Sequence, residues 1–443
     1  MPSSGRASIR SAAWAKLRRA APAPIGFALT AGAGALGSRP VGSYRDGRNV
    51  LPHLLIASTV LLGACTPLVT PTGTTTPVSD GSTATTARAP TTTAPGFDLE
   101  GASPAWETAV ANLYGTACGG NLGSLPAELA GRPEPSECPG GGTASIATFV
   151  ETEMAVATVG DDAIYGVDDG SGYRIVAVRL QGSGPASPGS RFAWYGQVPK
   201  VVVAVGSDAR PGEDPATTRA DSIHLLALDG LGHGGVLGIP RDSWVRIAGG
   251  GMSKINASLA TGGPAVMLQT VADVTGLNLD GYVITGFSGF QEMLGNVLGG
   301  VEVDLPFSIN DASAGADLSS GPQYLNGPDA LALARARKSL PGGDLTRQSN
   351  GGLILLAALS SVQAYGPLHL PTLISESAPW MSTDLTAAEL LAFSALALDT
   401  PVAGIGNQVV PGRIGTAGSA SVVYLTDSAP AFYVDLADGS LAP

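Results

Sequence analysis

The second half of the sequence predicts an α/β sandwich, because short buried strands alternate there with segments of helical spacing. Residues 201–205 form a five-residue apolar run that ends at Gly206, and residues 223–228 and 236–239 form two more such runs. Apolar residues with helical spacing follow over residues 263–275. This alternation is typical of a sheet with helices packed against its faces.

The later elements continue the same pattern. The sequence predicts helices over residues 289–298, 329–338, 349–362 and 385–396, and strands over residues 301–305 and 421–425. Pro328 suits the start of the second of these helices, and Thr383 or Asp384 suits the cap of the last. Residues 97–190 give mixed signals and form a small accessory region. There we expect helices over residues 106–114 and 146–156 and a strand over residues 173–180.

The charge of the chain excludes a broad nucleic-acid surface. The 443 residues carry a net charge of −12, and 44% of them are hydrophobic. The first 64 residues hold eight Lys or Arg and one acidic residue, so 16 basic and 35 acidic residues follow them. A chain this acidic lacks the cations needed to displace counterions from nucleic acid.

The N-terminal segment predicts export and a lipid anchor. Residues 54–64 form a short apolar run, which suits a signal peptide and is too short for a membrane-spanning helix of roughly 20 residues. Leu62-Gly63-Ala64-Cys65 matches a lipobox, so we expect a signal peptide over residues 1–64 and lipidation of Cys65. An uncleaved signal anchor is the alternative, and translation starting near Val41 would place the basic residues directly before the apolar run.

Residues 65–96 are rich in Thr and Pro and predict an extended tether.

The remaining two cysteines predict a disulfide. Cys118 and Cys138 flank a segment rich in Gly and Pro, and an exported chain meets an oxidising compartment. Two free thiols are the alternative. A zinc site is disfavoured because two thiolates without a nearby histidine are too few ligands.

The basic residues are concentrated where predicted elements begin and end. Nine of the 16 lie at positions 210, 219, 241, 246, 254, 335, 337, 338 and 347. Asp208 follows the first buried strand, Asp221 precedes the second, and Arg241 follows the third. Arginine binds two phosphate oxygens with its planar fork, and carboxylates hold Mg²⁺ beside phosphates. The pattern therefore predicts a pyrophosphate site for phosphoryl transfer, although each single Arg–Asp neighbour also suits an ordinary surface ion pair.

Six segments resemble successive motifs of the LytR-CpsA-Psr family, in the order and at the spacing of that family. They are VGSDARPGE (205–213), TTRADSIHLLALD (217–229), GIPRDSWVRI (238–247), KINASLATGGPAVMLQTVADVTGLNLDGYV (254–283), GFSGFQEMLGNVLGGVEVDLP (286–306) and LNGPDALALARARKSLPGGDLTRQ (325–348). The resemblance implies a three-layer α/β/α sandwich with a central mixed sheet. It places the catalytic domain over residues 200–365, with residues 366–443 as the C-terminal part of the same domain.

The resemblance also implies a function. Family members move a glycopolymer from a polyprenyl-pyrophosphate carrier to a peptidoglycan hydroxyl, at the outer face of the membrane. The implied metal ligands are Asp208 and Asp221, with Mg²⁺ or alternatively Mn²⁺ as the ion, and Asp208 is also the candidate general base. The implied pyrophosphate ligands are Arg219, Arg241, Lys254, Arg335, Arg337 and Arg347, with Asp208, Arg219, Asp221 and Arg241 as the catalytic set. The implied polyprenyl tunnel has candidate linings in residues 354–359, Val283, Phe287 and Phe290.

Two departures from the family pattern stand out. The chain reads Asn350-Gly351-Gly352 where many members have an Arg-Gln-Gln cluster, so one cation and one polar amide are missing. The predicted anchor is a lipid, whereas many members use a transmembrane helix. Other interpretations are a pyrophosphate hydrolase that uses water as acceptor, a lipoprotein that binds polyprenyl phosphates or wall polymer without turnover, and, less favoured, a solute-binding lipoprotein. His224 falls inside a predicted strand, where packing is the simpler role.

Overall fold

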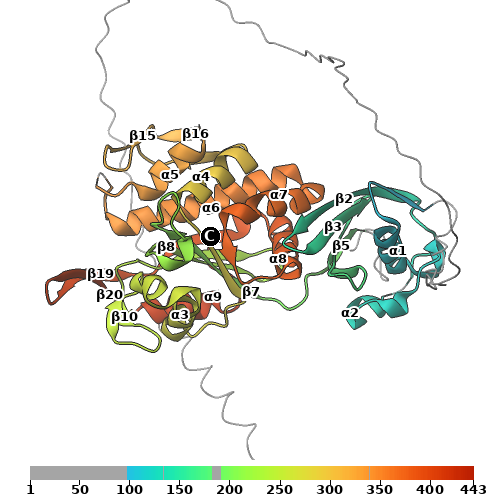
Figure 1. Ribbon diagram of the computed structural model, residues 1–443, viewed down its shortest axis with the longest axis horizontal. Coiled ribbons are helices and arrows are strands. Elements are labelled where there is room, and N and C mark those ends of the chain that lie inside the picture. Colours follow the sequence, from blue (N-terminus) through green and yellow to red (C-terminus); the bar gives the residue numbers. More distant parts are fainter. Residues whose placement is uncertain (1–96, 133, 182–190, 339) are drawn as a thin grey trace, which may run out of the picture. The chain divides into compact units, whose positions relative to one another are not determined.

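The computed structural model describes residues 97–132, 134–181, 191–338 and 340–443, which all belong to one compact unit (Figure 1). The predicted signal peptide, the lipidation of Cys65 and the predicted tether over residues 65–96 lie outside the described residues. No single helix among the described residues is long and apolar enough to cross a membrane. The helical segments 344–365 and 367–380 reach the length and apolar composition of a membrane span only when taken together, and the chain bends by 103° between them.

A six-stranded mixed sheet forms the middle layer of residues 200–443. Its strands lie in the order β17-β12-β7-β8-β9-β18. They are β7 (Lys200–Ser207), β8 (Ala220–Leu228), β9 (Gly234–Gly238), β12 (Gly281–Thr285), β17 (Ser382–Thr383) and β18 (Ile405–Val409). β7 pairs in parallel with β12 and antiparallel with β8, and β18 pairs in parallel with β9. The predicted mixed sheet is confirmed.

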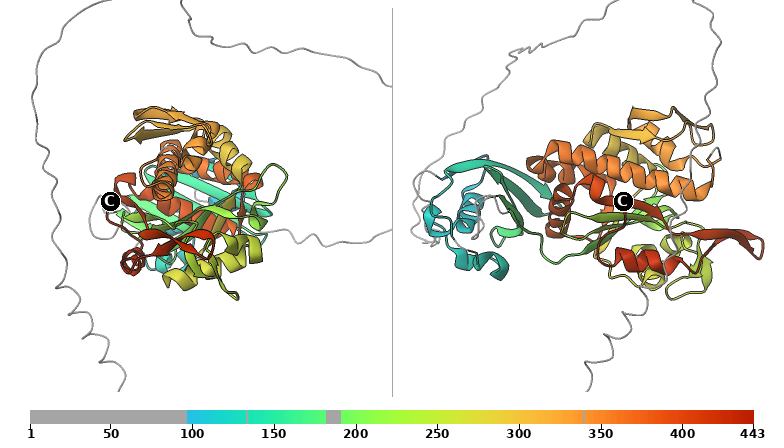
Figure 2. Two further views of the ribbon diagram at one scale, coloured as in Figure 1. Left: turned by 90° about the vertical axis from the view of Figure 1, so that its left-hand side faces the viewer. Right: turned by 180° about the vertical axis from the view of Figure 1, so that it is seen from behind.

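Helices cover both faces of this sheet, because successive strand residues point to opposite sides. Val201, Val203 and Val205 of β7 pack in one core with α3 (Ala257–Thr275) and α9 (Ala429–Leu436). Val202 faces the opposite core, which α6 (Asp344–Tyr365), α7 (Leu370–Ser377) and α8 (Ala387–Asp399) complete. Figure 2 shows the sheet between the two helical layers. The three-layer α/β/α sandwich is thus the observed fold.

A smaller cluster extends the layer that contains α6. It consists of α4 (Phe287–Glu292), a π-helical turn (Met293–Val297), α5 (Gly327–Arg335) and the strands β13 (Val301–Leu305), β14 (Ile309–Asp311), β15 (Ala316–Leu318) and β16 (Gly321–Leu325). The side chain of Asn326 caps α5 by accepting a hydrogen bond from the N–H of Asp329 at 2.9 Å. The predicted helix over residues 329–338 is too long, because Asp311 takes the N–H groups of Arg337 and Lys338 outside the helix.

Residues 98–194 form a second sheet, with its strands in sequence order from β1 to β6. They are β1 (Asp98–Glu100), β2 (Gly141–Phe149), β3 (Thr152–Val159), β4 (Asp162–Asp168), β5 (Arg174–Gln181) and β6 (Arg191–Trp194). The helix α1 (Pro104–Leu113) packs on one face of it. The other face shares a core with α7 and α8. Ser375 of α7 also donates a hydrogen bond to the carbonyl of Thr148 at 2.7 Å, so the two sheets belong to one packed structure.

The helix predicted over residues 146–156 is wrong, since these residues form the β2–β3 hairpin. Met154 and Val156 of β3 pack toward α7 and α8, whereas Ala155 and Ala157 pack toward α1. A strand buried on both faces has a continuous apolar run and loses the period-two alternation that identifies strands. The cap of α8 also differs from the prediction: Thr386 and Glu389 form a capping box there.

Cys118 and Cys138 form the disulfide that the sequence predicts. Cys118 is fully buried in the core around α1, and the two cysteines are separated by 20 positions of mostly irregular chain. The bond closes this segment, which has few regular hydrogen bonds of its own.

We predict that replacing both cysteines by alanine lowers the free energy of unfolding by about 3 kcal/mol, the loop-entropy contribution of a bridge of this span. Urea unfolding of residues 97–443 checks this, with the unchanged protein under a reducing agent as the matched comparison. An unchanged unfolding midpoint in the double variant would contradict a stabilising role.

Candidate functional site

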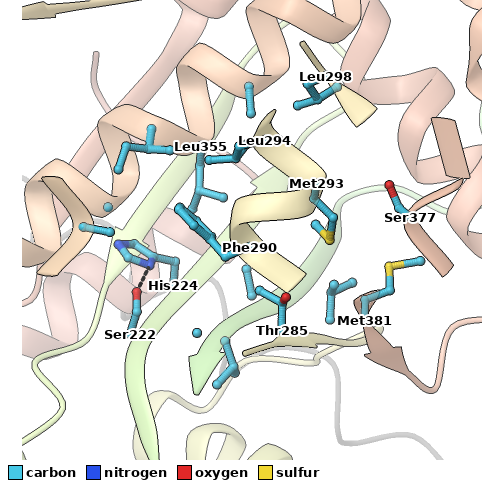
Figure 3. A pocket seen from close by; sticks show the side chains of 18 of the residues that line it. Ser222, His224, Thr285, Phe290, Met293, Leu294, Leu298, Leu355, Ser377 and Met381 are labelled. Carbon is cyan, nitrogen blue, oxygen red and sulfur yellow. Dashed lines mark hydrogen bonds between the residues drawn. The ribbon is translucent and has the colours of Figure 1, made fainter. Parts of the chain in front are cut away.

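A deep apolar cavity of about 370 Å³ lies between the central sheet and the helical layer that contains α6. Its walls come from strands β7, β8 and β12 on one side and from α4, α5, α6, α7 and α8 on the other. Figure 3 shows Phe290, Met293 and Leu294 pointing into it from α4 and the following π-helical turn, opposite Leu355 of α6. The cavity is therefore suited to a long apolar group.

Six of the nine residues proposed from the sequence as tunnel linings line this cavity, whereas Leu356, Ala357 and Leu359 lie outside its lining. The six are Val283, Phe287 and Phe290, together with Ile354, Leu355 and Ala358 of α6. The far wall is built by Leu370, Leu373 and Ile374 of α7 and by Leu390 and Phe393 of α8. Among the lining residues only Asp221, Arg335 and Arg347 carry charge at neutral pH, because His224 is buried and neutral.

Asp221 enters the cavity wall through a β-bulge. Ser207 and Gly206 of β7 pair with Ala220 and Ser222 of β8, so Asp221 between them has no cross-strand partner. A bulge of this kind redirects a side chain at the end of a strand, and bulges recur next to active sites. The local irregularity thus places one carboxylate at the charged end of the cavity.

Four charged side chains form a connected cluster at that end. Nη1 of Arg241 lies 2.5 Å from Oδ1 of Asp221, and its Nε lies 3.8 Å from Oδ1 of Asp344. Nη2 of Arg347 lies 2.8 Å from the same Asp344 oxygen. Asp344 therefore bridges two guanidinium groups. It is a site residue that the sequence reasoning did not assign, although its position one helical turn before Arg347 was a usable signal.

The cluster has unused hydrogen-bonding capacity. Within the described part of the chain, Nε of Arg241, Nε and Nη2 of Arg347 and both carboxylate oxygens of Asp344 are buried without a hydrogen-bond partner. The Arg347–Asp344 contact at 2.8 Å is accordingly a close ion pair whose donor is not aligned for a hydrogen bond. Buried polar atoms usually find partners, so these donors point to a ligand that supplies oxygen atoms.

Burial and the neighbouring carboxylates shift the pKa of Arg241 and of Arg347 in opposite directions. Burial lowers the pKa of Arg347, and the guanidinium groups of Arg241 and Arg337 lower it further, against the raising effect of Asp344 and Asp221. Burial also works to lower the pKa of Arg241, but Asp221, Asp344 and Asp242 together raise it above its ordinary value. Arg347 is therefore a desolvated cation that an added anion would stabilise.

Arg335 and Arg337 lie at the end of α5, on the solvent side of the cluster. The guanidinium of Arg335 sits 4.9 Å from the ring centroid of Phe287, a cation–π contact that fixes its direction. The N–H groups of Arg337 and Lys338 each donate to Oδ2 of Asp311 at 2.8 Å. Hydrogen bonds from the Ser313 hydroxyl and from these two N–H groups hold the pKa of Asp311 well below its usual range. Phe287, a candidate tunnel lining from the sequence, thus also supports Arg335, and Asp311 is a supporting residue that only its tertiary contacts identify.

The other predicted residues lie beside the cavity and outside its lining. Asp208 follows β7, its Oδ1 accepts a hydrogen bond from the N–H of Arg219 at 2.9 Å, and its own N–H donates to the carbonyl of Arg219 at 3.0 Å. Arg219 is exposed. Nζ of Lys254 lies 2.8 Å from Oδ1 of Asp242, the residue that follows Arg241 in the sequence. The structure thus joins Asp221, Arg241 and Arg347 with Asp344 in one chain of ion pairs, and Arg335 lines the same cavity.

Comparison with known proteins now decides the family. A model of the LytR_cpsA_psr family matches residues 187–432, which is more than half of the chain. The chain belongs to the LytR-CpsA-Psr family. The expectation drawn from its motifs is confirmed.

Two named relatives in this family are similar over 179 residues, or 38% of the chain. The probable cell wall biosynthesis protein LcpB of Corynebacterium glutamicum is 35% identical over 43% of its own length. The polyisoprenyl-teichoic acid–peptidoglycan teichoic acid transferase TagV of Bacillus subtilis is 34% identical over 46% of its length. The crystal structure of B. subtilis TagV covers 55% of the chain and 98% of its own, with 26% identity and a TM-score of 0.47. The matched sequence thus spans less than half of each named relative.

The family departure at Asn350-Gly351-Gly352 has a local structural counterpart. A Cβ atom at Gly351 would lie 2.7 Å from Cε1 of His224, and one at Gly352 would lie 2.0 Å from Oδ1 of Asn407. The two glycines let α6 approach the sheet closely. Figure 3 shows His224 and Ser222 side by side in the cavity wall, joined by a hydrogen bond of 3.1 Å.

Three hydrogen bonds tie the first turns of α6 to the sheet. Nε2 of His224 donates to the carbonyl of Gln348 at 2.9 Å, and Nε2 of Gln348 donates to the carbonyl of Ile239 at 2.6 Å. Nδ2 of Asn407 donates to the carbonyl of Ser349 at 3.0 Å. These bonds hold the residues directly after Arg347. His224 is therefore a packed, neutral side chain that positions α6, as its place in a strand suggested.

The carboxylates present suit a magnesium ion. Asp208 and Asp221 stand at adjacent ends of the neighbouring strands β7 and β8. Within the described ranges no group of three or more His, Cys, Asp or Glu residues is arranged to hold a metal. Mg²⁺ in phosphate sites takes one or two protein carboxylates and completes its octahedron with phosphate oxygens and water. Asp208 and Asp221 are thus the carboxylates beside the anion site that would hold such an ion.

We predict that stability falls as the pH drops from about 6.5 toward 4, in part because of His224. Burial lowers the pKa of His224 from 6.5 to about 4, so the unfolded chain binds a proton in this range that the folded protein does not. This difference between the pKa of His224 in the folded and in the unfolded chain corresponds to a loss of up to about 3 kcal/mol in the free energy of unfolding at the acidic end of the range.

The measurement is the free energy of unfolding in urea at about pH 7.5 and about pH 4.5, for the unchanged protein and for His224→Gln. Glutamine keeps a donor for the Gln348 carbonyl without titrating. The variant should lose less stability on acidification, and equal losses would mean that His224 titrates normally in the folded state.

Proposed function

We propose that this protein is a Mg²⁺-dependent phosphotransferase that moves a glycopolymer from a polyprenyl-pyrophosphate carrier to a hydroxyl of peptidoglycan. The single observation that carries the proposal is the cavity, which is apolar along its length and ends at a cluster of guanidinium groups. A ligand that fills such a site is an anion with a long hydrocarbon tail. Membership of the family and the teichoic acid transferase activity for which TagV is named support the same class of substrate.

The apolar part of the cavity suits the polyprenyl tail. Each methylene group removed from water contributes about 0.8 kcal/mol, so several buried isoprene units bind strongly without any polar contact. Phe290, Leu294 and Leu355 supply surface for this purpose. The tail also holds the pyrophosphate at the charged end, so that the reacting phosphorus has a fixed position.

The charged end suits the pyrophosphate. The unused Nε and Nη2 donors of Arg347 and the Nε donor of Arg241 are available to phosphate oxygens, and Arg335 and Arg337 approach from the solvent side. In a site with little water, these cations stabilise charge that grows on the phosphoryl oxygens during transfer. Arg219 reaches the substrate from the loop before β8, and Lys254 reaches it from the end of β11 (Met252–Lys254).

The proposed reaction is a single displacement at the phosphorus that carries the sugar polymer. The oxygen of the acceptor hydroxyl forms a bond to this phosphorus, and the bond from the phosphorus to the bridging oxygen breaks. Polyprenyl phosphate leaves with the electron pair, and the carboxylate of Asp208 takes the proton of the hydroxyl. Asp208 and Asp221 would hold Mg²⁺, and the chemistry supplied by the bound ion would be charge neutralisation and a lowered pKa of the hydroxyl.

The proposed location is the outer face of the cell membrane. A lipid on Cys65 would anchor the chain there, and the tether over residues 65–96 would let the domain reach both carrier and wall. The disulfide between Cys118 and Cys138 supports an oxidising compartment.

We predict that Asp221→Asn and Arg347→Ala each lower the transfer rate by at least about 100-fold, because each removes charge stabilisation at the reacting phosphate. Arg413→Ala is the matched control, since Arg413 is exposed on β19 (Gly412–Ala417), outside the cavity lining. The assay follows a labelled lipid-linked oligosaccharide with a peptidoglycan acceptor in Mg²⁺ and in chelator, and circular dichroism checks the fold. Near-normal transfer in either variant would overturn the assignment. Carrier cleavage that is equally fast without acceptor would instead identify a hydrolase.

We predict that Leu294→Trp selects against long carriers. The larger side chain fills part of the cavity, so the KM for a donor with a long prenyl tail should rise by roughly tenfold or more, while a donor with one or two isoprene units should be little affected. Steady-state kinetics with the two donors measure this. Equal effects on both would mean that the tail does not occupy the cavity.

A further inference from the structure

A second cleft, of about 350 Å³, adjoins the charged end of the first cavity. It lies between the loop of residues 209–215 and the turn of residues 379–382, and it shares Gly286 and Met381 with the cavity lining. The loop begins directly after Asp208, the proposed general base. A molecule in this cleft would therefore lie beside the reacting phosphate and outside the space for the hydrocarbon tail.

One wall of the cleft carries a tryptophan whose backbone is held in place. The carbonyl of Trp380 accepts a hydrogen bond from Oγ1 of Thr285 at 2.9 Å. A Cβ atom at Gly289 would lie 2.4 Å from that carbonyl oxygen, so the glycine allows this close approach. Trp380 nevertheless remains 38% exposed. A partly open indole on an anchored backbone in the wall of a cleft offers an apolar face to a ligand.

The opposite wall is a short loop braced by its own acidic residues. Oε2 of Glu213 accepts a hydrogen bond from the N–H of Arg210 at 2.8 Å, and Oδ1 of Asp214 accepts one from the N–H of Ala216 at 2.9 Å. The loop thus presents fixed carboxylates across from the indole. An aromatic face opposite hydrogen-bond acceptors suits a pyranose ring, which has an apolar C–H face and a rim of hydroxyl groups.

The charges of the two spaces differ in sign. The first cavity is lined by two arginines and one aspartate, a net charge of +1, and the cleft by one arginine, one glutamate and one aspartate, a net charge of −1. A pyrophosphate is attracted to the first and disfavoured in the second. A sugar hydroxyl that carries no phosphate has no such penalty in the cleft.

We propose that this cleft binds the glycan strand of the acceptor and that Trp380 is its main contact. The proposal rests on the proposed transferase function, which it deepens by giving the acceptor a site distinct from that of the donor. The carbon chain and pyrophosphate of the donor occupy the cavity, the acceptor sugar stacks on Trp380, and its hydroxyl lies near Asp208.

The first test measures glycan binding without any donor. The probe is a soluble tetrasaccharide of alternating N-acetylglucosamine and N-acetylmuramic acid, titrated by calorimetry into residues 97–443. Trp380→Ala should weaken binding by at least about tenfold, and Trp380→Phe should retain most of it. Tyr424→Ala is the matched control, because Tyr424 is a similarly exposed aromatic residue on β20 (Ala420–Leu425), at 40%. Binding that is equal in Trp380→Ala and the unchanged protein would overturn the proposal.

The second test separates the acceptor from the donor. In the transfer assay, Trp380→Ala should raise the KM for the acceptor by roughly tenfold while the KM for the donor stays unchanged. A raised donor KM with an unchanged acceptor KM would overturn the proposal and assign the cleft to the first sugar of the donor. If the unchanged protein shows no transfer but binds the tetrasaccharide in a Trp380-dependent way, the transferase proposal fails and the glycan site stands.

Discussion

The candidate site depends on one electrostatic arrangement, the pair of guanidinium groups that Asp344 holds together. Arg241 and Arg347 repel each other, and burial raises the cost of bringing both close to an apolar cavity. One carboxylate at 2.8 Å from Arg347 and 3.8 Å from Arg241 offsets much of that repulsion without using up the donors of either arginine. The arginines are thus held in position and still able to bind an oxyanion.

Close packing of α6 against the sheet makes this arrangement possible. The glycines at positions 351 and 352 remove the side chains that would meet His224 and Asn407. His224 and Asn407 then bond the carbonyl groups of Gln348 and Ser349, which directly follow Arg347. A feature that looks in the sequence like the loss of a cation and an amide is, in the structure, the contact surface that buries Arg347 at 6% exposure. The accessory sheet contributes from the far side, because it packs on α7 and α8, which form the end wall of the cavity.

Much of the architecture follows from local sequence patterns. The strands around Val203, Leu225 and Leu237 and the helices around Met267 and Leu391 arise from apolar runs whose length and spacing select the element. The β2–β3 hairpin was not predicted, because it is buried on both faces and therefore lacks the alternation of apolar and polar residues that identifies a strand. The end of α5 was not predicted, because the N–H groups of Arg337 and Lys338 donate to the side chain of Asp311 instead of continuing the helix.

By itself, the sequence determined the alternation of strands and helices after residue 200, the cysteine pair and the concentration of scarce arginines at the ends of elements, because each depends on local composition and spacing. Only the tertiary structure decided which of those arginines meet. It joined Arg241 and Arg347 through Asp344, paired Asp221 directly with Arg241, and paired Lys254 with the neighbouring Asp242. It also set Trp380 beside the loop after Asp208, across 172 positions of chain. Contacts between residues so distant in sequence depend on how the layers pack, and local patterns carry no record of that packing.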